Sequence, residues 1–294
     1  MQYGNYTVPM QVRQIERMIA NKEKVLVVSS VDGTALSDVM KKAADAGIPV
    51  IAYDRLIMNS PNVDYYASHD NFKTGVLQGQ SIVHGLGLDT GKTGPFNIEL
   101  LAGPATDNNA KYFFNGAMSV LLPLIDDGRL VVQSKQTTLD AIATPNWDFG
   151  IARVRLASII EGYYRATHID AVLSPVDVFS VSAVIPALKS AGYGSKDLPM
   201  PIITGQDGQV DAVKAIIAGD QYSTVFKDTR ELAKVTAAMV DAVASGGKPE
   251  INDTSYSNGV KIVPAYLVNV VTVDANNWKS ELVDSGYYVI GAFQ

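Results

Sequence analysis

The apolar positions near the start of the chain follow two different spacings. From Val8 to Lys22 they recur every three or four residues, which is the spacing of one face of a helix. The run from Lys24 to Ser30 is short, continuous and rich in Val, as is typical of a parallel strand buried on both faces. A helical spacing over Thr34 to Ala46 and an apolar run over Ile48 to Tyr53 repeat this pair. The pattern predicts helices and strands in alternation.

The same alternation extends to residue 245. Further strands are predicted at residues 65–67, 96–101, 130–134, 171–173, 201–204 and 222–226. Helices are predicted between them at residues 71–86, 108–126, 149–166, 178–191, 210–218 and 229–245. Alternating strands and helices indicate parallel sheets that are covered by helices.

The pattern changes after Ser245. The sequence Gly246-Gly247-Lys248-Pro249 ends the last helix, and Asn258-Gly259 is a strong turn signal. Two apolar runs, at residues 260–263 and 266–273, are predicted to be strands. With these runs the predicted strands reach the number, about ten, beyond which a single sheet tends to split, so we expect two sheets.

The predicted fold class is α/β, with two doubly wound parallel-sheet lobes joined by a hinge of three crossings. The crossings are predicted near Gly103-Pro104, Lys227-Asp228 and Pro264-Ala265. The N-terminal lobe then comprises residues 1–103 and 229–264, and the C-terminal lobe residues 104–228 and 265–294. A length of 294 residues, about twice that of a usual domain, agrees with two lobes.

Composition removes several classes of function. The chain has 24 Lys plus Arg against 30 Asp plus Glu, a net charge of −6 without a basic block, which argues against nucleic acid as a partner. The absence of Cys excludes disulfides, thiolate catalysis and Cys-ligated zinc, and it leaves the redox compartment open. No apolar run approaches the roughly 18 residues of a membrane span, so no membrane insertion is predicted. The first residues do not read as a secretion signal.

Polar side chains follow the predicted strands. In open parallel sheets ligands bind beyond the carboxyl ends of the strands, so these are the candidate binding residues. They are Asp54, Arg55, Asp107, Asn109, Asp177, Asp207 and Lys227. A neutral polyhydroxy ligand suits this mixture, because each hydroxyl both donates and accepts hydrogen bonds. Trp147 could supply a flat surface for the C–H face of a sugar ring.

Other roles for these residues stay open. An Asp before a helix is most often an N-cap, which covers Asp107, Asp177 and Asp207, and Asp54-Arg55 could be an ion pair between lobes. Trp147 could simply be packed. The three His form no close-spaced metal pair, and neither a Gly-x-Ser-x-Gly elbow nor a Gly-rich phosphate loop occurs, so no metal or cofactor is predicted. Paired carboxylates for glycoside hydrolysis remain an alternative.

Five ordered motifs resemble those of a known family. They are Val50-Ile51-Ala52-Tyr53-Asp54-Arg55, Asp70-Asn71, Asp107-Asn108-Asn109-Ala110, Gly205-Gln206-Asp207 and Thr224-Val225-Phe226-Lys227. Together they resemble the type I periplasmic sugar-binding proteins of ABC transporters, with the xylose-binding and multiple-monosaccharide receptor branch as the nearest likeness. The resemblance extends over practically the whole chain.

The resemblance implies two α/β lobes that close around one aldose in a cleft. Carried over, Asp54 and Arg55 bind the sugar from the first lobe. From the second lobe the contacts come from Asp107, Asn109 and Asp207, with Trp147 stacking on the sugar and Lys227 reaching in from a hinge crossing. Val176 and Asp177 are candidates for lining the cleft. Relatives place Asn or Tyr before this Asp, so Val176 implies one polar contact fewer.

The resemblance also implies a periplasmic monomer without catalytic activity, whose partners are a monosaccharide, an ABC permease and a chemoreceptor. Met1-Gln2-Tyr3 resembles the family's second strand, so we expect the first strand and helix of the family to be missing, and with them the place where a signal peptide would stand. Two alternatives remain: the sensor core of a sugar-responsive transcription regulator, which predicts a helix-turn-helix upstream, and a sugar-processing enzyme.

Overall fold

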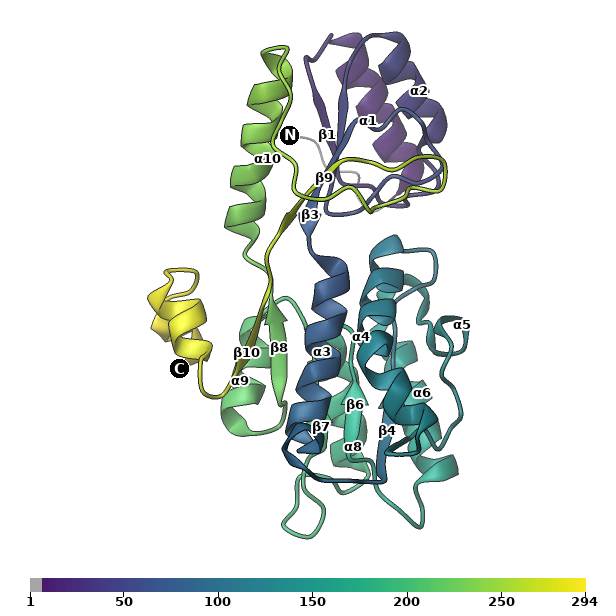
Figure 1. Cartoon of the computed structure of the whole chain (residues 1–294), viewed down its shortest axis with the longest axis vertical. Coiled ribbons are helices and arrows are strands. Elements are labelled where there is room, and N and C mark those ends of the chain that lie inside the picture. Colours follow the sequence, from purple (N-terminus) through teal and green to yellow (C-terminus); the bar gives the residue numbers. More distant parts are fainter. Residues whose placement is uncertain (1–6) are drawn as a thin grey trace. The chain divides into compact units, whose positions relative to one another are not determined.

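The computed structural model describes residues 7–294, which divide into two compact units (Figure 1). The first unit comprises the chain up to Asp70 together with Thr106–Asn109 and Asp228–Asn269. The second unit comprises Asn71–Ala105, Ala110–Lys227 and Val270–Gln294. The chain therefore passes between the units after Asp70, after Lys227 and after Asn269, with a short return to the first unit at Thr106–Asn109.

The first unit is built on a four-stranded parallel sheet with the order β1-β2-β3-β9. Its strands are β1 (Leu26–Val28), β2 (Val50–Tyr53), β3 (Tyr65–His69) and β9 (Ala265–Val268). Its helices are α1 (Val8–Ala20), α2 (Ser37–Asp45) and α10 (Thr229–Ala244). The side chain of Gln11 in α1 joins the helix to the end of β1, donating to Ser29 O (2.7 Å) and accepting from Val31 N (2.9 Å). These two hydrogen bonds fix the loop that follows β1.

The centre of this sheet is apolar on both faces, as the continuous apolar runs predict. Ile51 in β2 and Ala67 in β3 are fully buried and pack against Leu232 and Met239 of α10. Asp228 begins α10 as an N-cap, its side chain accepting a hydrogen bond from Arg230 N at 2.9 Å.

The second unit contains a parallel sheet with the order β5-β4-β6-β7 and an antiparallel pair, β8 and β10. Its strands are β4 (Phe96–Leu100), β5 (Leu130–Val131), β6 (Ala171–Leu173), β7 (Ile202–Ile203), β8 (Ser223–Phe226) and β10 (Val271–Asp274). A parallel bridge between Gln206 and Val225 connects the loop after β7 with β8.

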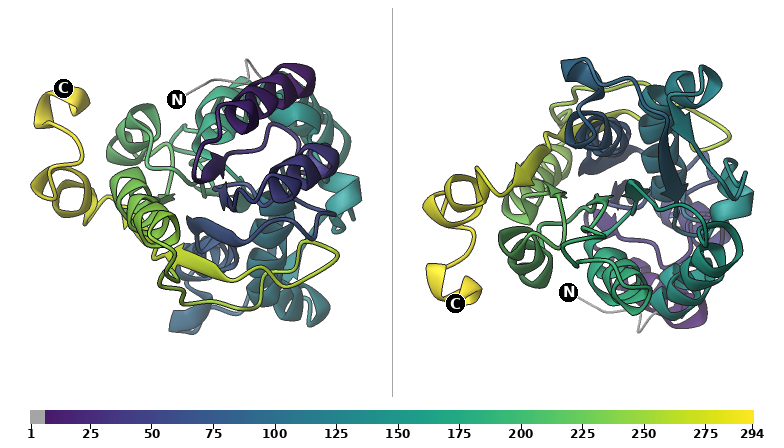
Figure 2. Two further views of the ribbon diagram at one scale, coloured as in Figure 1. Left: turned by 90° about the horizontal axis from the view of Figure 1, so that it is seen from above. Right: turned by 90° about the horizontal axis from the view of Figure 1, so that it is seen from below.

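The helices of the second unit flank its parallel sheet (Figure 2). The C-terminal segment of the chain lies beside α9. The helices are α3 (Asn71–Gly85), α4 (Asn108–Asp126), α5 (Leu139–Ile142), α6 (Phe149–Tyr163), α7 (Asp177–Phe179), α8 (Ile185–Ser190) and α9 (Val210–Ala218). Shorter helical turns occupy η1 (Leu88–Thr90), η2 (Pro145–Trp147), η3 (Ser180–Val184), η4 (Ser280–Asp284) and η5 (Ile290–Phe293). None of the helices within residues 7–294 has the length and apolar character that a bilayer span needs.

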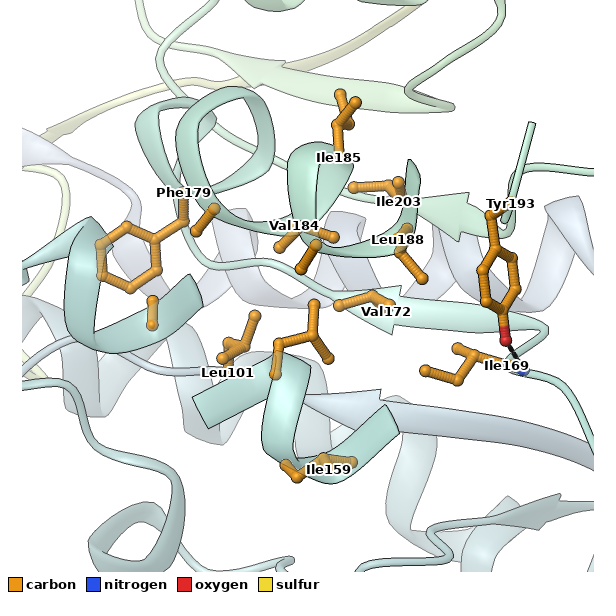
Figure 3. Packing of buried hydrophobic residues seen from close by; sticks show 14 of the residues in the cluster. Leu101, Ile159, Ile169, Val172, Phe179, Val184, Ile185, Leu188, Tyr193 and Ile203 are labelled. Carbon is orange, nitrogen blue, oxygen red and sulfur yellow. Dashed lines mark hydrogen bonds between the residues drawn. The ribbon is translucent and has the colours of Figure 1, made fainter. Parts of the chain in front are cut away.

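Two apolar cores cover the two faces of the second sheet. Leu100 and Leu173 pack toward α3 and α4, whereas Val172 packs toward α6 and α8. Figure 3 shows the second of these cores, in which Tyr193 Oη accepts a hydrogen bond from Ile169 N at 2.7 Å. The alternation of side-chain direction along β6 thus divides its residues between two cores.

Helices α3 and α4 approach closely because glycines lie at their crossing. A Cβ built on Gly116 would stand 2.0 Å from Phe72 O and 2.9 Å from Val76 N, both in α3. Neither backbone atom can move aside without shifting its helix. The crossing therefore requires glycine at position 116.

We expect Gly116→Ala to lower the free energy of unfolding of the second unit by about 2 kcal/mol or more, because the added methyl group overpacks the crossing. Gly162→Ala in α6 is the matched control, since a Cβ there meets nothing within 4 Å and should stabilise the helix slightly. Urea unfolding followed by tryptophan emission measures both changes. Equal stabilities for the two variants would contradict the prediction.

Most predicted helices and strands are confirmed, with the bounds of α4, α9 and β6 as expected from the sequence. The predicted strand at residues 260–263 is wrong, because Ser257 and Ile262 form only an isolated bridge there. The predicted single strand at residues 266–273 is also wrong, because it divides into β9, which pairs with β3, and β10, which pairs with β8.

The division of the chain differs from the predicted lobes in three main places. Residues 71–103 lie in the second unit and not in the first, because β4 pairs with β5 and β6. Residues 106–109 lie in the first unit and not in the second. The last passage comes after Asn269 and not near Pro264-Ala265, because the first sheet includes β9. Local periodicity identifies these strands but carries no information about their pairing.

Candidate functional site

Four of the predicted binding residues gather in the first unit. We call Asp54, Arg55, Asp107 and Asn109 the first polar group. Asp54 directly follows β2 and adopts φ 60°, in the left-handed region that Asp tolerates better than most residues. Its backbone carbonyl accepts hydrogen bonds from Tyr66 Oη (2.6 Å), Ser68 Oγ (3.1 Å) and Asn109 Nδ2 (3.0 Å). These three donors fix the turn that presents Asp54.

Arg55 and Asp107 form an ion pair, with Arg55 Nε 3.4 Å from Asp107 Oδ2. Arg55 also donates to Val31 O at 3.3 Å. The other oxygen of Asp107, Oδ1, accepts a hydrogen bond from Asn109 N at 2.9 Å. Asp107 therefore holds the first turn of α4 and the guanidinium of Arg55 at the same time, so the capping and binding interpretations of this residue are compatible.

Tyr66 supports the first polar group from within the sheet. Its hydroxyl donates to Asp54 O and lies 3.3 Å from Asn109 Oδ1. Burial, and after it the charge of Asp54, raises the pKa of Tyr66 well above its ordinary value. The hydroxyl therefore stays protonated and acts as a donor. Sequence reasoning missed this residue, because nothing in a strand pattern distinguishes a supporting Tyr from a packed one.

The second unit holds a second pair of charges, Asp207 and Lys227, which we call the second polar group. Lys227 follows β8 and places its Nζ 3.3 Å from Asp207 Oδ1. The same Nζ lies 4.9 Å from the centre of the Phe113 ring, within the range of a cation–π contact. Asp207, in the loop after β7, adopts φ 100°. The two polar groups belong to different units.

Trp147 lies on a tight turn and packs against its own unit. Asn146 and Trp147 both adopt left-handed backbone angles, φ 55° and 56°. The indole lies so close to Gly103 that a Cβ there would stand 2.1 Å from the ring, and it meets Phe179 edge to face at 5.8 Å. Part of the indole ring is therefore packed against the second unit, as one of the two interpretations expects. The side chain as a whole is half-buried.

Asp177 is fully buried, which corrects the expectation that it lines a cleft. Its Oδ2 accepts from Gln209 N (2.9 Å) and Thr224 Oγ1 (2.9 Å), and its Oδ1 accepts from Gln221 Nε2 (3.2 Å). Burial, and after it the charge of Asp207, raises the pKa of Asp177 to about 8. Val176 beside it is 8% exposed and offers no polar side chain.

The structure places two of the predicted residues in a different unit from the one expected. Asp107 and Asn109 lie in the first unit and not the second, because their side chains bond to Arg55 and Asp54. Within residues 7–294 no group of three His, Asp or Glu side chains is placed to hold a metal ion. The two polar groups supply amide and cationic donors beside carboxylate acceptors. Such a mixture can hold a ligand whose groups both donate and accept.

Comparisons with known proteins agree with this chemistry. A family model described as periplasmic binding protein domain matches residues 1–248. The multiple sugar-binding periplasmic receptor ChvE of Rhizobium radiobacter is 55% identical over 289 residues, which cover 98% of this chain and 81% of that protein. The D-xylose-binding periplasmic protein of Escherichia coli (strain K12) is 35% identical over 290 residues, covering 98% of this chain and 81% of that protein.

A solved structure shows the same architecture. An ABC transporter solute binding protein from Clostridium phytofermentans, with β-D-glucose bound, has a TM-score of 0.92 and 45% identity, covering 100% of this chain and 89% of that one. The fold is that of the type I periplasmic binding proteins, two α/β units of the doubly wound class. The chain belongs to the periplasmic binding protein domain family. The resemblance drawn from the ordered motifs is thereby confirmed.

Proposed function

We propose that the protein is an extracytoplasmic receptor that captures a monosaccharide, an aldose such as xylose, galactose, glucose or arabinose, and delivers it to an ABC permease without converting it. Two similar proteins support this proposal. One is a multiple sugar-binding receptor at 55% identity, and the other is a solute binding protein with bound β-D-glucose at 45% identity. These relatives are described as receptors and binding proteins.

The observation that carries the proposal is the pairing of a cation with a carboxylate in each unit. Arg55 pairs with Asp107, and Lys227 pairs with Asp207. Arg55 and Asp207 lie on loops that follow β2 and β7, which are strands of parallel sheets, and ligands of α/β sheets bind at such loops. Charge-assisted hydrogen bonds to sugar hydroxyls are stronger than neutral ones, and a neutral sugar leaves both charge pairs intact.

Each predicted residue has a role in the proposed site. Asp54 and Asp207 accept hydrogen bonds from hydroxyl groups, and Arg55 and Lys227 donate to hydroxyl or ring oxygens. Asn109 and Asp107 complete the first set of contacts, and Trp147 provides the flat surface for the C–H face of the ring. Val176 adds an apolar contact at most.

Isothermal titration with xylose, galactose, glucose, arabinose and ribose tests the proposal. We expect saturable heat with at least one of them and a stoichiometry of one. Chromatography of the mixture after prolonged incubation should recover the sugar unchanged, which separates a receptor from an enzyme. Absence of heat with every aldose would contradict the proposal, and formation of a product would replace it with a catalytic function.

We expect Lys227→Met to weaken binding of the preferred aldose at least tenfold, because the variant loses a charged donor and leaves Asp207 without its counter-charge. Lys234→Met is the matched control, since Lys234 is exposed and its Nζ stands 3.5 Å from Glu231 on the surface of α10. Titration calorimetry measures both variants. Equal affinities would remove Lys227 from the site.

A further inference from the structure

A cluster of buried polar side chains lies beneath the loop that carries Asp207. Asp177, Gln221 and Thr224 are 0%, 3% and 0% exposed. Through its side chain Asp177 accepts from Gln209 N, and through its backbone N–H it donates to Gln206 O at 3.0 Å. Asp177 thus bonds to residues on both sides of Asp207 without reaching the surface.

The loop also rests directly on the carboxyl group of Asp177. A Cβ on Gly205 would stand 2.1 Å from Asp177 Oδ1, so only glycine allows this approach. The carbonyl of Gly205 accepts from Gln78 Nε2 at 3.1 Å. The start of the loop is therefore held between α3 and the side chain of Asp177, all within the second unit.

Asp207 itself has a backbone conformation that needs such support. A φ of 100° is unfavourable for a residue with a side chain, and it persists only where the surroundings determine it. Asp207 N donates to Val225 O at 2.9 Å, and Gln206 and Gln209, on either side of Asp207, bond to Asp177. Loss of these bonds would let the loop relax, and the carboxylate of Asp207 would turn away from Lys227.

We propose that Asp177 is a positioning residue for sugar binding, which acts from below the surface by holding residues 205–209 so that Asp207 faces the ligand. The inference rests on the proposed function, because it names the residue that orients Asp207, and Asp207 is one of the proposed sugar contacts. It assigns Asp177 no contact with the sugar.

The proton on Asp177 is part of this role. The charged and titratable groups around it are Asp207 above it, Lys227 beyond Asp207, and Tyr288 of the C-terminal segment. With a pKa of about 8, Asp177 is neutral at pH 7, so Asp207 carries the only carboxylate charge of the two. Above that pH a second negative charge develops beneath Asp207 and repels it.

Gln221 offers a place for this proton. Its Oε1 is buried and has no hydrogen-bond partner among the described residues, although its Nε2 bonds to Asp177 Oδ1 and Ser223 O. A turn of the Gln221 amide would let Oε1 accept the proton of Asp177. Asn at position 177 reproduces this neutral form, because its oxygen can accept from Gln209 N and Thr224 while its amide donates to Gln221. Leu has a similar volume and can do neither.

The first part of the experiment measures sugar affinity by titration calorimetry from pH 6 to 9.5 for the parent, Asp177→Asn and Asp177→Leu. We expect the parent to bind at least fivefold more weakly at pH 9.5 than at pH 7. The Asn variant should stay within about threefold of the parent at pH 7 and show a flat profile. The Leu variant should bind about thirtyfold more weakly. Equal pH profiles for the parent and the Asn variant would overturn the proposal, whether or not the Leu variant folds.

The second part needs no sugar. In ¹⁵N spectra of the parent, the backbone amides of Asp207, Gly208 and Gln209 should shift together with a midpoint near pH 8, and in Asp177→Asn this step should vanish. A step that persists in the variant, or is absent from the parent, would refute a positioning role. If the parent gives this step but no heat with any aldose, the proposed function fails while the control of the loop by Asp177 stands.

Discussion

Asp54→Ala is expected to weaken sugar binding by more than a hundredfold. The carboxylate of Asp54 is a proposed acceptor for sugar hydroxyls, and removal of a charged partner from a hydrogen-bonded site costs about 1.5 to 3 kcal/mol per bond. Ala is also strained at the φ of 60° that Asp54 adopts, so the turn held by Tyr66 and Asn109 would shift as well. Titration calorimetry with the preferred aldose measures the change.

Two controls separate the lost contact from the strained backbone. Asp54→Asn keeps a side chain that tolerates φ 60° and removes only the charge, so we expect an intermediate loss of affinity. Asn59→Ala introduces the same strain at φ 56°, at a position whose backbone bonds to Ser37 and Asn258 and not to the first polar group. It should leave the affinity unchanged. An Asp54→Ala variant that binds like the parent would exclude Asp54 from the site.

The second large effect concerns stability and pH. The pKa of Asp177 is raised to about 8 in the folded protein from the ordinary value of 3.8. Between these pH values the folded state holds a proton that the unfolded state has lost, so stability falls as pH rises. The fall amounts to about 1.4 kcal/mol per pH unit, hence about 4 kcal/mol between pH 5 and pH 8, and it ends above the folded pKa. Asp177→Asn lacks this contribution.

We therefore expect Asp177→Asn to be more stable than the parent at pH 8, with the difference shrinking toward pH 5. Urea unfolding from pH 5 to 8.5, followed by tryptophan emission, measures it. Both tryptophans of the chain, Trp147 and Trp278, lie in the second unit, so the signal reports the unit that contains Asp177. Parallel stability curves for the two proteins would show that Asp177 does not carry the proton.

Local patterns predicted the elements of this fold well. The helical spacing of apolar residues gave α4 and α9 their bounds, and continuous apolar runs located β2 and β6. The pattern failed at residues 266–273, where one apolar run is two strands in two sheets. Both strands are apolar because each is partly covered, so hydrophobicity cannot show where the first ends.

The candidate binding residues could be predicted because of where they stand in the chain. Polar side chains directly after apolar runs mark the carboxyl ends of parallel strands, and this rule located Asp54, Arg55 and Asp207. It could not locate Tyr66, whose role depends on a carbonyl twelve residues away in sequence. Nor could it reveal that Asp177 is buried, because that follows from Gly205, Gln221 and Thr224 closing over it.

The sequence by itself determined the alternation of helices and strands, the mixture of charges at the strand ends and the likeness to sugar receptors. These depend on spacing and order along the chain, which local side-chain chemistry encodes. Only the tertiary structure decided that β4 belongs to the second unit, that Asn109 bonds to Asp54 in the first, and that Asp177 lies beneath Asp207. The physical reason is that strand pairing, burial and hydrogen bonding between distant residues depend on which segments meet, and no single segment specifies its partner.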